Sequence, residues 1–145
     1  MIKLISIALL AALSAIAQPS ASKKMVVPAG SRVGPNFSPG IQAGDTLYVS
    51  GQTGTDPQTQ KVPDKFEDEV QLCLDHIAAI LKAGGMDFSN AVSVTVYLTD
   101  ISLFQRMNAV YVKAFPEPRP ARTTVGISAL AAAGAHIEIS VTAHK

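Results

Sequence analysis

The chain has 145 residues, which is enough for one domain of ordinary size. Lys and Arg number 12 and Asp and Glu number 11, so the net charge is +1. This near-balance argues against a dedicated nucleic-acid-binding protein, which would carry a basic excess. Hydrophobic residues make up 48% and charged residues 16% of the chain, a composition that excludes intrinsic disorder.

The first 17 residues have the pattern of a secretory signal peptide. Lys3 precedes an uncharged apolar run, residues 4–16, and the small residues Ala15 and Ala17 flank Ile16 as they do before a cleavage site. The run is short for a membrane span, so an N-terminal anchor or a buried helix is the less favoured alternative. We expect cleavage after Ala17, a periplasmic or secreted protein without stable membrane anchoring, and a single domain over residues 18–145.

The first half of the mature chain predicts strands followed by a helix. Residues 18–24 are small and polar and predict a flexible leader, and residues 29–40 are rich in Gly and Pro and predict a loop. Residues 46–50 predict a strand that, after turns at 51–57, returns as a hairpin at 61–62. A helix follows, with Asp64 as its N-cap and Glu67 at capping-box spacing, and Gly84 and Gly85 end it. Its apolar stripe consists of Phe66, Val70, Cys73, Leu74, Ile77, Ile80 and Leu81.

The second half predicts a strand at 91–98, a helix at about 102–114, and strands at 122–127 and 136–143. Helices that alternate with single strands indicate an α+β fold in which two helices pack on one face of a mixed sheet. In such a sheet we expect apolar residues to face the helices: Val92, Val94, Val96, Val125, Ile127, Ile137, Ile139 and Val141. The opposite face would carry small polar residues with few charges. Such a face favours packing in a homo-oligomer, with an ordinary solvated face as the alternative.

Several chemistries find little support in the sequence. Cys73 is the only cysteine, so no intramolecular disulfide can form, and its place on the apolar stripe predicts a core residue. His76, His136 and His144 do not have metal-ligand spacing, and no phosphate-binding glycine motif occurs. Ser50 lacks the motif of a nucleophilic serine and is interpreted as a strand end. The run Glu67-Asp68-Glu69 is interpreted as favourable charge in the first helical turn.

Arg122 and Glu138 are the candidate chemical pair. Both are expected on the polar face, on two strands that are expected to be neighbours. A salt bridge between them is the simpler interpretation, because an unpaired carboxylate in mid-strand would be costly. The functional alternative is that Arg122 grips a substrate carboxylate with its planar fork while Glu138 positions a water molecule as general base.

Eight segments resemble one family, in the correct order and over nearly the whole mature chain. The segments are residues 34–39 (GPNFSP), 43–52 (AGDTLYVSGQ), 56–57 (DP), 81–85 (LKAGG), 95–100 (TVYLTD), 108–115 (NAVYVKAF), 120–125 (PARTTV) and 137–139 (IEI). In these segments the chain resembles the reactive-intermediate deaminase family (RidA, or YjgF-type).

The resemblance implies a chorismate-mutase-like homotrimer with sites between neighbouring subunits. It implies hydrolysis of 2-imino acids or their enamine tautomers to 2-keto acids and ammonia, as in 2-iminobutanoate/2-iminopropanoate deaminases, without metal or organic cofactor. By the resemblance Arg122 binds the substrate carboxylate and Glu138 handles the attacking water. Four further residues are implied to line or support the pocket: Ser50, Gly51, Thr124 and Asn108. Phe37 also belongs to the implied site, at a position where many relatives have Tyr, so that the hydroxyl is absent. Thr124 similarly replaces a common Cys.

Two other functions remain as alternatives. The same pocket would serve a non-catalytic protein that binds a keto acid or amino acid, an alternative that Phe37 favours and the pair Arg122 and Glu138 opposes. An endoribonuclease, a description given to some relatives, is disfavoured by the neutral mature charge. We therefore expect a small-molecule imino acid as substrate and no nucleic-acid partner.

Overall fold

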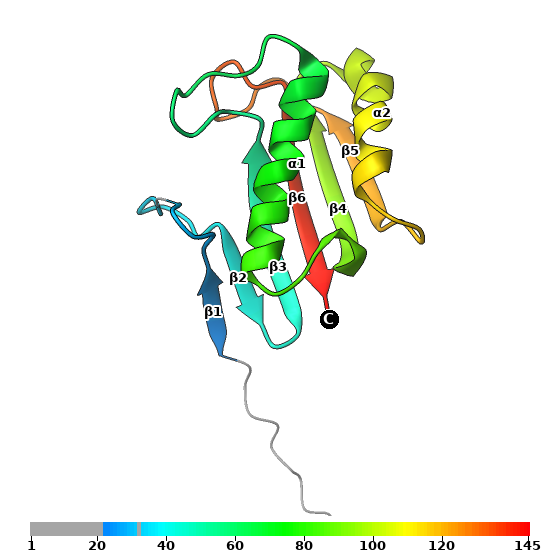
Figure 1. Cartoon of the computed structure of the whole chain (residues 1–145). Coiled ribbons are helices and arrows are strands. Elements are labelled where there is room, and N and C mark those ends of the chain that lie inside the picture. The colour runs from blue at the N-terminus through cyan, green and yellow to red at the C-terminus, as the bar shows by residue number, and fades with distance from the viewer. Residues whose placement is uncertain (1–21, 32) are drawn as a thin grey trace, which may run out of the picture.

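The computed structural model describes residues 22–31 and 33–145, so the expected signal peptide lies outside the described residues. A six-stranded mixed sheet carries two helices on one face (Figure 1), which confirms the predicted α+β fold. The strands are β1 (Lys23–Val26), β2 (Gly40–Ala43), β3 (Thr46–Thr53), β4 (Ala91–Leu98), β5 (Ala121–Gly126) and β6 (Ile137–His144). The helices are α1 (Phe66–Ala83) and α2 (Phe104–Ala114), and the 3-10 turns η1 (Phe88–Asn90) and η2 (Ile101–Leu103) precede β4 and α2.

The strand order is β1-β2-β3-β6-β4-β5. β6 lies antiparallel between β3 and β4, and β4 pairs parallel with β5. Each of the two helices therefore connects strands that run in the same direction: α1 leads from β3 to β4, and α2 leads from β4 to β5. Both connections cross the same face of the sheet, which leaves the other face open.

The core lies between the two helices and the strands β3, β4 and β6. Val94, Val96 and Leu98 of β4 and their partners on β6 are buried, and the intervening side chains are not, as the strict alternation predicts. Cys73 is fully buried on the apolar stripe of α1, and burial raises the pKa of its thiol. The predicted role of Cys73 as a core residue is confirmed. None of the helices in the described part of the chain is long and apolar enough to cross a membrane.

Three local predictions before and within α1 are wrong. Lys23 and Lys24, the end of the predicted leader, belong to the edge strand β1 instead, because β2 offers them an unpaired edge. Residues 61–62 form no strand, since the Asp56 N–H donates to the carbonyl of Lys61 at 2.8 Å and closes a loop instead. α1 begins at Phe66 with Lys65 at the N-cap and no side-chain cap, so Asp64 does not cap it.

The predicted faces of β5 are reversed in the structure. Arg122 and Thr124 pair with the buried residues Val94 and Val96 of β4, so they face the helices, whereas Val125 is 38% exposed on the open face. β5 is an edge strand covered only by the short helix α2 (Figure 1). The core therefore does not extend to β5, and Val125 is not required to face it. A register shift between Ala91 and Ser93 likewise leaves Val92 49% exposed.

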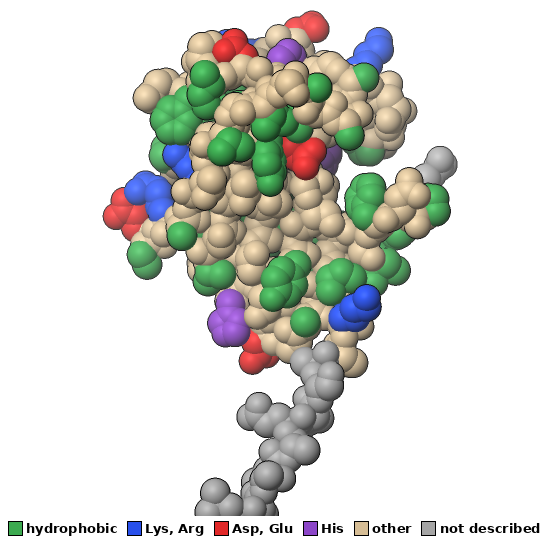
Figure 2. All heavy atoms as spheres, turned by 180° about the vertical axis from the view of Figure 1, so that it is seen from behind, with side chains coloured by type: hydrophobic (Ala, Val, Ile, Leu, Met, Phe, Trp, Pro, Cys, Tyr) green, Lys and Arg blue, Asp and Glu red, His purple; other side chains and the backbone are tan. Residues whose placement is uncertain are grey.

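The open face is the side of the sheet without helices. It carries Tyr48, Ser93, Thr95, Tyr97, Thr123, Ser140 and Thr142, with Glu138 as the only acidic residue among β3 to β6 on this side. Figure 2 shows this face, which is dominated by uncharged polar atoms and scattered hydrophobic groups. Tyr48 is 51% exposed there although it is aromatic.

Candidate active site

The predicted site residues form two groups at different places on the subunit. Phe37, Ser50, Gly51 and Glu138 line one cleft. Arg122 and Thr124 lie on the edge strand β5, and Asn108 lies on α2, the helix whose aromatic rings contact Arg122. We call these two places the Glu138 cleft and the Arg122 edge.

The Glu138 cleft is an open hollow of about 1480 Å³. Its walls include residues 28–31, Phe37 and Pro39, the 55–60 loop, β3 and one side of α1. The Glu138 side chain reaches across β3 over Gly51: a Cβ atom at position 51 would lie 2.1 Å from Glu138 Oε1. Gly51 therefore provides the space that this carboxylate occupies. A register shift between Val49 and Gln52 lets the β3 backbone bulge at this point.

Hydrogen bonds fix the walls of this cleft. The Ser50 hydroxyl donates to the carbonyl of Ser38 at 2.6 Å, and the Ser50 N–H donates to the carbonyl of Pro39 at 2.9 Å. These bonds attach the loop that carries Phe37 to β3. Ser50 thus anchors the loop. It lies within β3 and not at its end, so its interpretation as a strand end is wrong.

Two side chains of α1 contact backbone carbonyls at the end of β3. The Cys73 thiol donates to the carbonyl of Gln52 at 3.0 Å, and His76 Nδ1 lies 3.0 Å from the carbonyl oxygen of Thr53. Because a carbonyl can only accept, Nδ1 carries the proton in this contact. The sequence analysis assigned no role to His76, which lines the cleft together with Glu138. His76 lies three residues after the buried Cys73, and this helical spacing indicated that His76 is on the side of α1 that faces the sheet.

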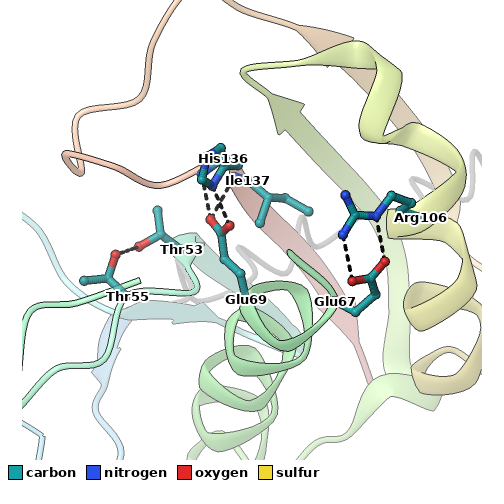
Figure 3. A network of polar contacts seen from close by, with 7 residues as sticks. All are labelled: Thr53, Thr55, Glu67, Glu69, Arg106, His136 and Ile137. Carbon is teal, nitrogen blue, oxygen red and sulfur yellow. Dashed lines mark hydrogen bonds and ion pairs between the residues drawn. The ribbon is translucent and has the colours of Figure 1, made fainter. Parts of the chain in front are cut away.

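Glu69 fixes the start of β6, two residues before the catalytic candidate Glu138. The Glu69 side chain is fully buried, and its Oε1 accepts the N–H of His136 at 2.6 Å and that of Ile137 at 3.3 Å (Figure 3). Its Oε2 lies 2.8 Å from Nδ1 of His136. Glu69 lies in the first turn of α1, as predicted for the run Glu67-Asp68-Glu69, but the prediction did not include its burial or its bonds to β6. It lies on the apolar stripe, three residues after Phe66 and four before Cys73, so the periodicity already placed it inward.

At the Arg122 edge the guanidinium group rests on aromatic rings of α2. The carbon of the guanidinium lies 4.5 Å from the ring centroid of Tyr111 and 5.5 Å from that of Phe104. These are cation–π distances. Asn108 lies four residues after Phe104 and three before Tyr111, and so belongs to the same stripe of the helix. Thr124 follows two residues after Arg122 on the same side of β5. Neither aromatic residue was expected in the site.

Arg122 and Glu138 do not meet within one subunit. β4 separates their strands, and Arg122 is level with Val141, three residues along β6 from Glu138. Two strand spacings and three residues are each about 10 Å, and the two side chains leave opposite faces of the sheet. The expected salt bridge and the expected neighbouring strands are both wrong. No ion pair joins the two residues in the part of the chain that the structure describes.

The described residues offer no ready metal site. Within 22–31 and 33–145, no three His, Cys, Asp or Glu side chains form a group suited to hold a metal ion. The two groups of site residues instead offer a cation on an aromatic platform and a carboxylate beside a strand backbone. These are the groups needed to bind an anion and to move a proton.

The fold and these two groups of residues define a small α+β protein with a mixed sheet and two helices on one face. The chain matches the family described as Endoribonuclease L-PSP over residues 30–145 and belongs to that family. It is 44% identical over 114 residues to a RutC family protein of Saccharolobus solfataricus, covering 78% of this chain and 89% of that protein. It is 40% identical over 112 residues to the 2-iminobutanoate/2-iminopropanoate deaminase of Bos taurus, covering 77% of this chain and 80% of that protein. The solved structure of RidA from an Antarctic Psychrobacter species superposes with a TM-score of 0.76 at 33% identity, covering 84% of this chain and 99% of that one.

These similarities confirm the RidA/YjgF-type family and the fold that the sequence resemblance implied. They also support a general role in reactive-intermediate deamination, because relatives of about 40% identity carry that name.

Proposed function

We propose that this protein hydrolyses 2-imino acids, or their enamine tautomers, to 2-keto acids and ammonia. The site is completed by two subunits of a homotrimer: the Glu138 cleft of one subunit and the Arg122 edge of its neighbour. Phe37, Ser50 and Gly51 belong to the first half, and Asn108 and Thr124 to the second. The observation that carries this proposal is the separation of Arg122 from Glu138 on opposite faces of the sheet.

The open face supports the assembly. It carries a single carboxylate among strands β3 to β6, and the exposed side chains of Tyr48, Val92 and Val125 add apolar area to it. An exposed face of this kind with so few charges favours contact with other copies of the chain over solvation. Because Glu138 stands on this face near the level of Val125, packing of copies through it brings the cleft close to a subunit boundary.

The chemistry needs little more than orientation. The imine carbon is already electrophilic, and Arg122 would hold the substrate carboxylate through two parallel hydrogen bonds. Glu138 would take a proton from water as the new C–O bond forms and pass it to the imine nitrogen, which gives the neutral carbinolamine. The carbinolamine hydroxyl would then give its proton, through Glu138, to the amino nitrogen as the C–N bond breaks and the C=O bond forms. The keto acid and ammonia leave, and Glu138 is again a carboxylate.

A second candidate is a protein that binds a keto acid or amino acid at the same place without turning it over. Phe37 favours it, because this ring is 64% exposed at the cleft and has no hydroxyl to offer a substrate or a water molecule. We favour the enzyme, since both an anion-binding cation and a carboxylate near a strand backbone are present.

The test uses two variants that each lack one half of the site. Arg122→Ala and Glu138→Gln are purified alone and as mixed trimers, obtained by coexpression with two different affinity tags. Ammonia release is measured from 2-iminopropanoate that an amino-acid oxidase generates in the cuvette. Each variant alone should be inactive. Every mixed trimer contains one boundary with both native groups, so it should regain about one third of wild-type activity.

Other outcomes would overturn parts of the proposal. Mixed trimers as inactive as the single variants would mean that both groups must act within one subunit. Wild-type protein that binds a keto acid but does not accelerate ammonia release would establish the binding protein instead. Salt-dependent RNA cleavage by the wild type, lost in both variants, would replace the deaminase with a ribonuclease at the same residues.

We also propose that the chain is exported and cleaved after Ala17, on the strength of its N-terminal pattern. N-terminal sequencing of the protein recovered outside the cytoplasm should then begin at Gln18. Recovery of the intact Met1 terminus in the cytoplasm would remove this part of the proposal.

A further inference from the structure

Arg122 rests on an aromatic stack that continues into the core. Its guanidinium carbon lies 4.5 Å from the Tyr111 ring, and that ring is stacked on Phe115 at 4.3 Å with an interplanar angle of 24°. Phe115 in turn meets Phe88 edge-on at 4.7 Å. Tyr111 is only 2% exposed. The ring under the cation is therefore held in place by core packing.

Two buried hydroxyls beside this cation are unsatisfied. Tyr111 Oη and Thr124 Oγ1 have no hydrogen-bond partner in the described part of the chain. Buried polar groups are nearly always paired in folded proteins, so two exceptions, one on the ring under Arg122 and one two residues along its strand, require an explanation. Phe115, on which the Tyr111 ring is stacked, carries no side-chain acceptor or donor. The guanidinium of Arg122, which lies over the Tyr111 ring, is a donor group.

We propose that Tyr111 is a positioning residue for Arg122: its ring fixes the guanidinium plane, and its hydroxyl accepts a guanidinium N–H once a carboxylate occupies the fork. A guanidinium has five N–H donors, and a bidentate carboxylate uses two of them, so a donor remains for Tyr111. The Tyr111 hydroxyl is then unpaired without ligand, and it accepts the guanidinium N–H when the carboxylate binds. Burial raises the pKa of Tyr111, an effect that Arg122 opposes, so the phenol stays neutral and can accept.

This inference rests on the proposed role of Arg122 as the carboxylate clamp. The affinity for the anion then depends on Tyr111, although Tyr111 does not touch the substrate. A flat ring beneath the guanidinium leaves the edge of the fork free, which is the edge that a planar carboxylate approaches. The stack therefore orients the fork before the ligand arrives, and less freedom is lost on binding.

The experiment measures pyruvate binding by calorimetry, and steady-state turnover, in wild type, Tyr111→Phe, Tyr111→Leu and Arg122→Ala. Tyr111→Phe keeps the ring and removes the hydroxyl. It should weaken pyruvate binding by about tenfold, the worth of one hydrogen bond to a charged group. KM should rise by a similar factor while kcat changes little. Tyr111→Leu should weaken binding further, because it also removes the stacked ring.

A thermal melt separates this role from a purely structural one. Without ligand, Tyr111→Phe should melt at the wild-type temperature or above it, because it removes an unpaired buried hydroxyl. The rise in melting temperature that saturating pyruvate causes should shrink in this variant. A melting temperature that falls while pyruvate affinity stays unchanged would show that the hydroxyl serves stability only, and would overturn the inference.

The outcomes for the inference and for the proposed function are distinguishable. If Arg122→Ala loses pyruvate binding while Tyr111→Phe and Tyr111→Leu bind as wild type does, the clamp stands and the positioning role is wrong. If Tyr111→Leu binds pyruvate no more weakly than Tyr111→Phe, the ring of Tyr111 does not contribute to the positioning of Arg122. If Arg122→Ala binds pyruvate as wild type does, Arg122 is not the carboxylate clamp, and both the proposed role of Arg122 and the inference about Tyr111 are wrong.

Discussion

The Glu138 cleft and the Arg122 edge are built in different ways. The cleft lies where β3 bulges. Ser50 and Cys73 donate hydrogen bonds to backbone carbonyls around its carboxylate, and Glu69 accepts the N–H of His136 before β6. The Arg122 edge is a regular parallel strand without a bulge, and its cation is held by aromatic packing on α2. A carboxylate that must move a proton needs an exact place relative to a water molecule. A cation that must grip an anion needs chiefly a fixed plane.

The comparison also shows that neither region is a complete site. Among the described residues that line the cleft there is no arginine or lysine, and the Arg122 edge contains no carboxylate on its own face of β5. The two are complementary in charge and lie on opposite faces of one sheet. Association of copies is the simplest way to bring complementary half-sites together. Changes that act on assembly, on one half-site or on the elements that support it should therefore have separable effects.

The largest effect is expected from a charge in the middle of the open face. Thr95→Arg places a cation on β4 between Ser140 and Thr123, where packing of copies would bury it without a partner. The variant should be monomeric in analytical ultracentrifugation and should lose turnover entirely, although its circular dichroism stays native. Gln71→Arg, on the solvent side of α1, is the matched control and should remain a fully active trimer.

A trimeric and active Thr95→Arg protein would mean that copies do not associate through this face. The half-sites would then have to meet along another surface of the subunit.

Gly51→Ala should damage only the cleft. The new Cβ would lie 2.1 Å from Glu138 Oε1, so the carboxylate must leave its place over β3. A displacement of about 1 Å is enough to cost on the order of 100-fold in kcat. Pyruvate affinity should change far less, because Arg122 belongs to the other half-site. Gly34→Ala serves as the control, since nothing lies within 4 Å of a Cβ there.

Equal losses of affinity and kcat in Gly51→Ala would contradict the division of labour between the two half-sites. Stopped-flow turnover together with calorimetry on the same preparations distinguishes the two results.

The sequence predicted the layers of the fold better than the geometry of the site. Alternation holds in residues 94–98 and 137–143, and both strands lie in the sheet interior, so these inward faces were predictable. In β5 the same pattern shows that Arg122 and Thr124 share a face, but it does not show which face the helices cover. That depends on the strand order, in which β4 separates β5 from β6, and strand order is a long-range property.

Other parts of the site left a local signal. The position of Glu69 on the apolar stripe of α1 indicated burial, and Asn108 and Tyr111 share one side of a helix three residues apart. For the close approach of Glu138 to β3, the glycine at position 51 is the only local signal. The reason for that glycine is a carboxylate on a strand 87 positions later in the chain.

Glu69→Gln should weaken the support of the cleft. Glu69 accepts two backbone N–H groups and the ring of His136, all as a buried carboxylate. Glutamine replaces one acceptor oxygen with a donor, which leaves a buried N–H unpaired and costs about 1–3 kcal/mol in the free energy of unfolding. Urea denaturation measures this loss. Glu67→Gln, in the same helical turn but at the surface, should cost less; the reverse order would mean that the carboxylate of Glu69 is not required.

The smallest effect concerns the ion pair that ties α1 to the helix beside Arg122. Arg106 donates to both oxygens of Glu67, at 2.7 and 2.9 Å, and holds the pKa of Glu67 at about 2, below its ordinary value of 4.5 (Figure 3). Because the folded-state pKa is lowered, this stabilisation is complete above the unfolded value and is lost as the pH falls toward 2. Arg106→Gln should therefore be less stable than wild type by a constant amount above about pH 5. Its deficit should shrink between pH 4.5 and pH 2. A deficit independent of pH would mean that Arg106 stabilises the protein through its packing on Phe66, 5.4 Å from the ring centroid, rather than through its charge.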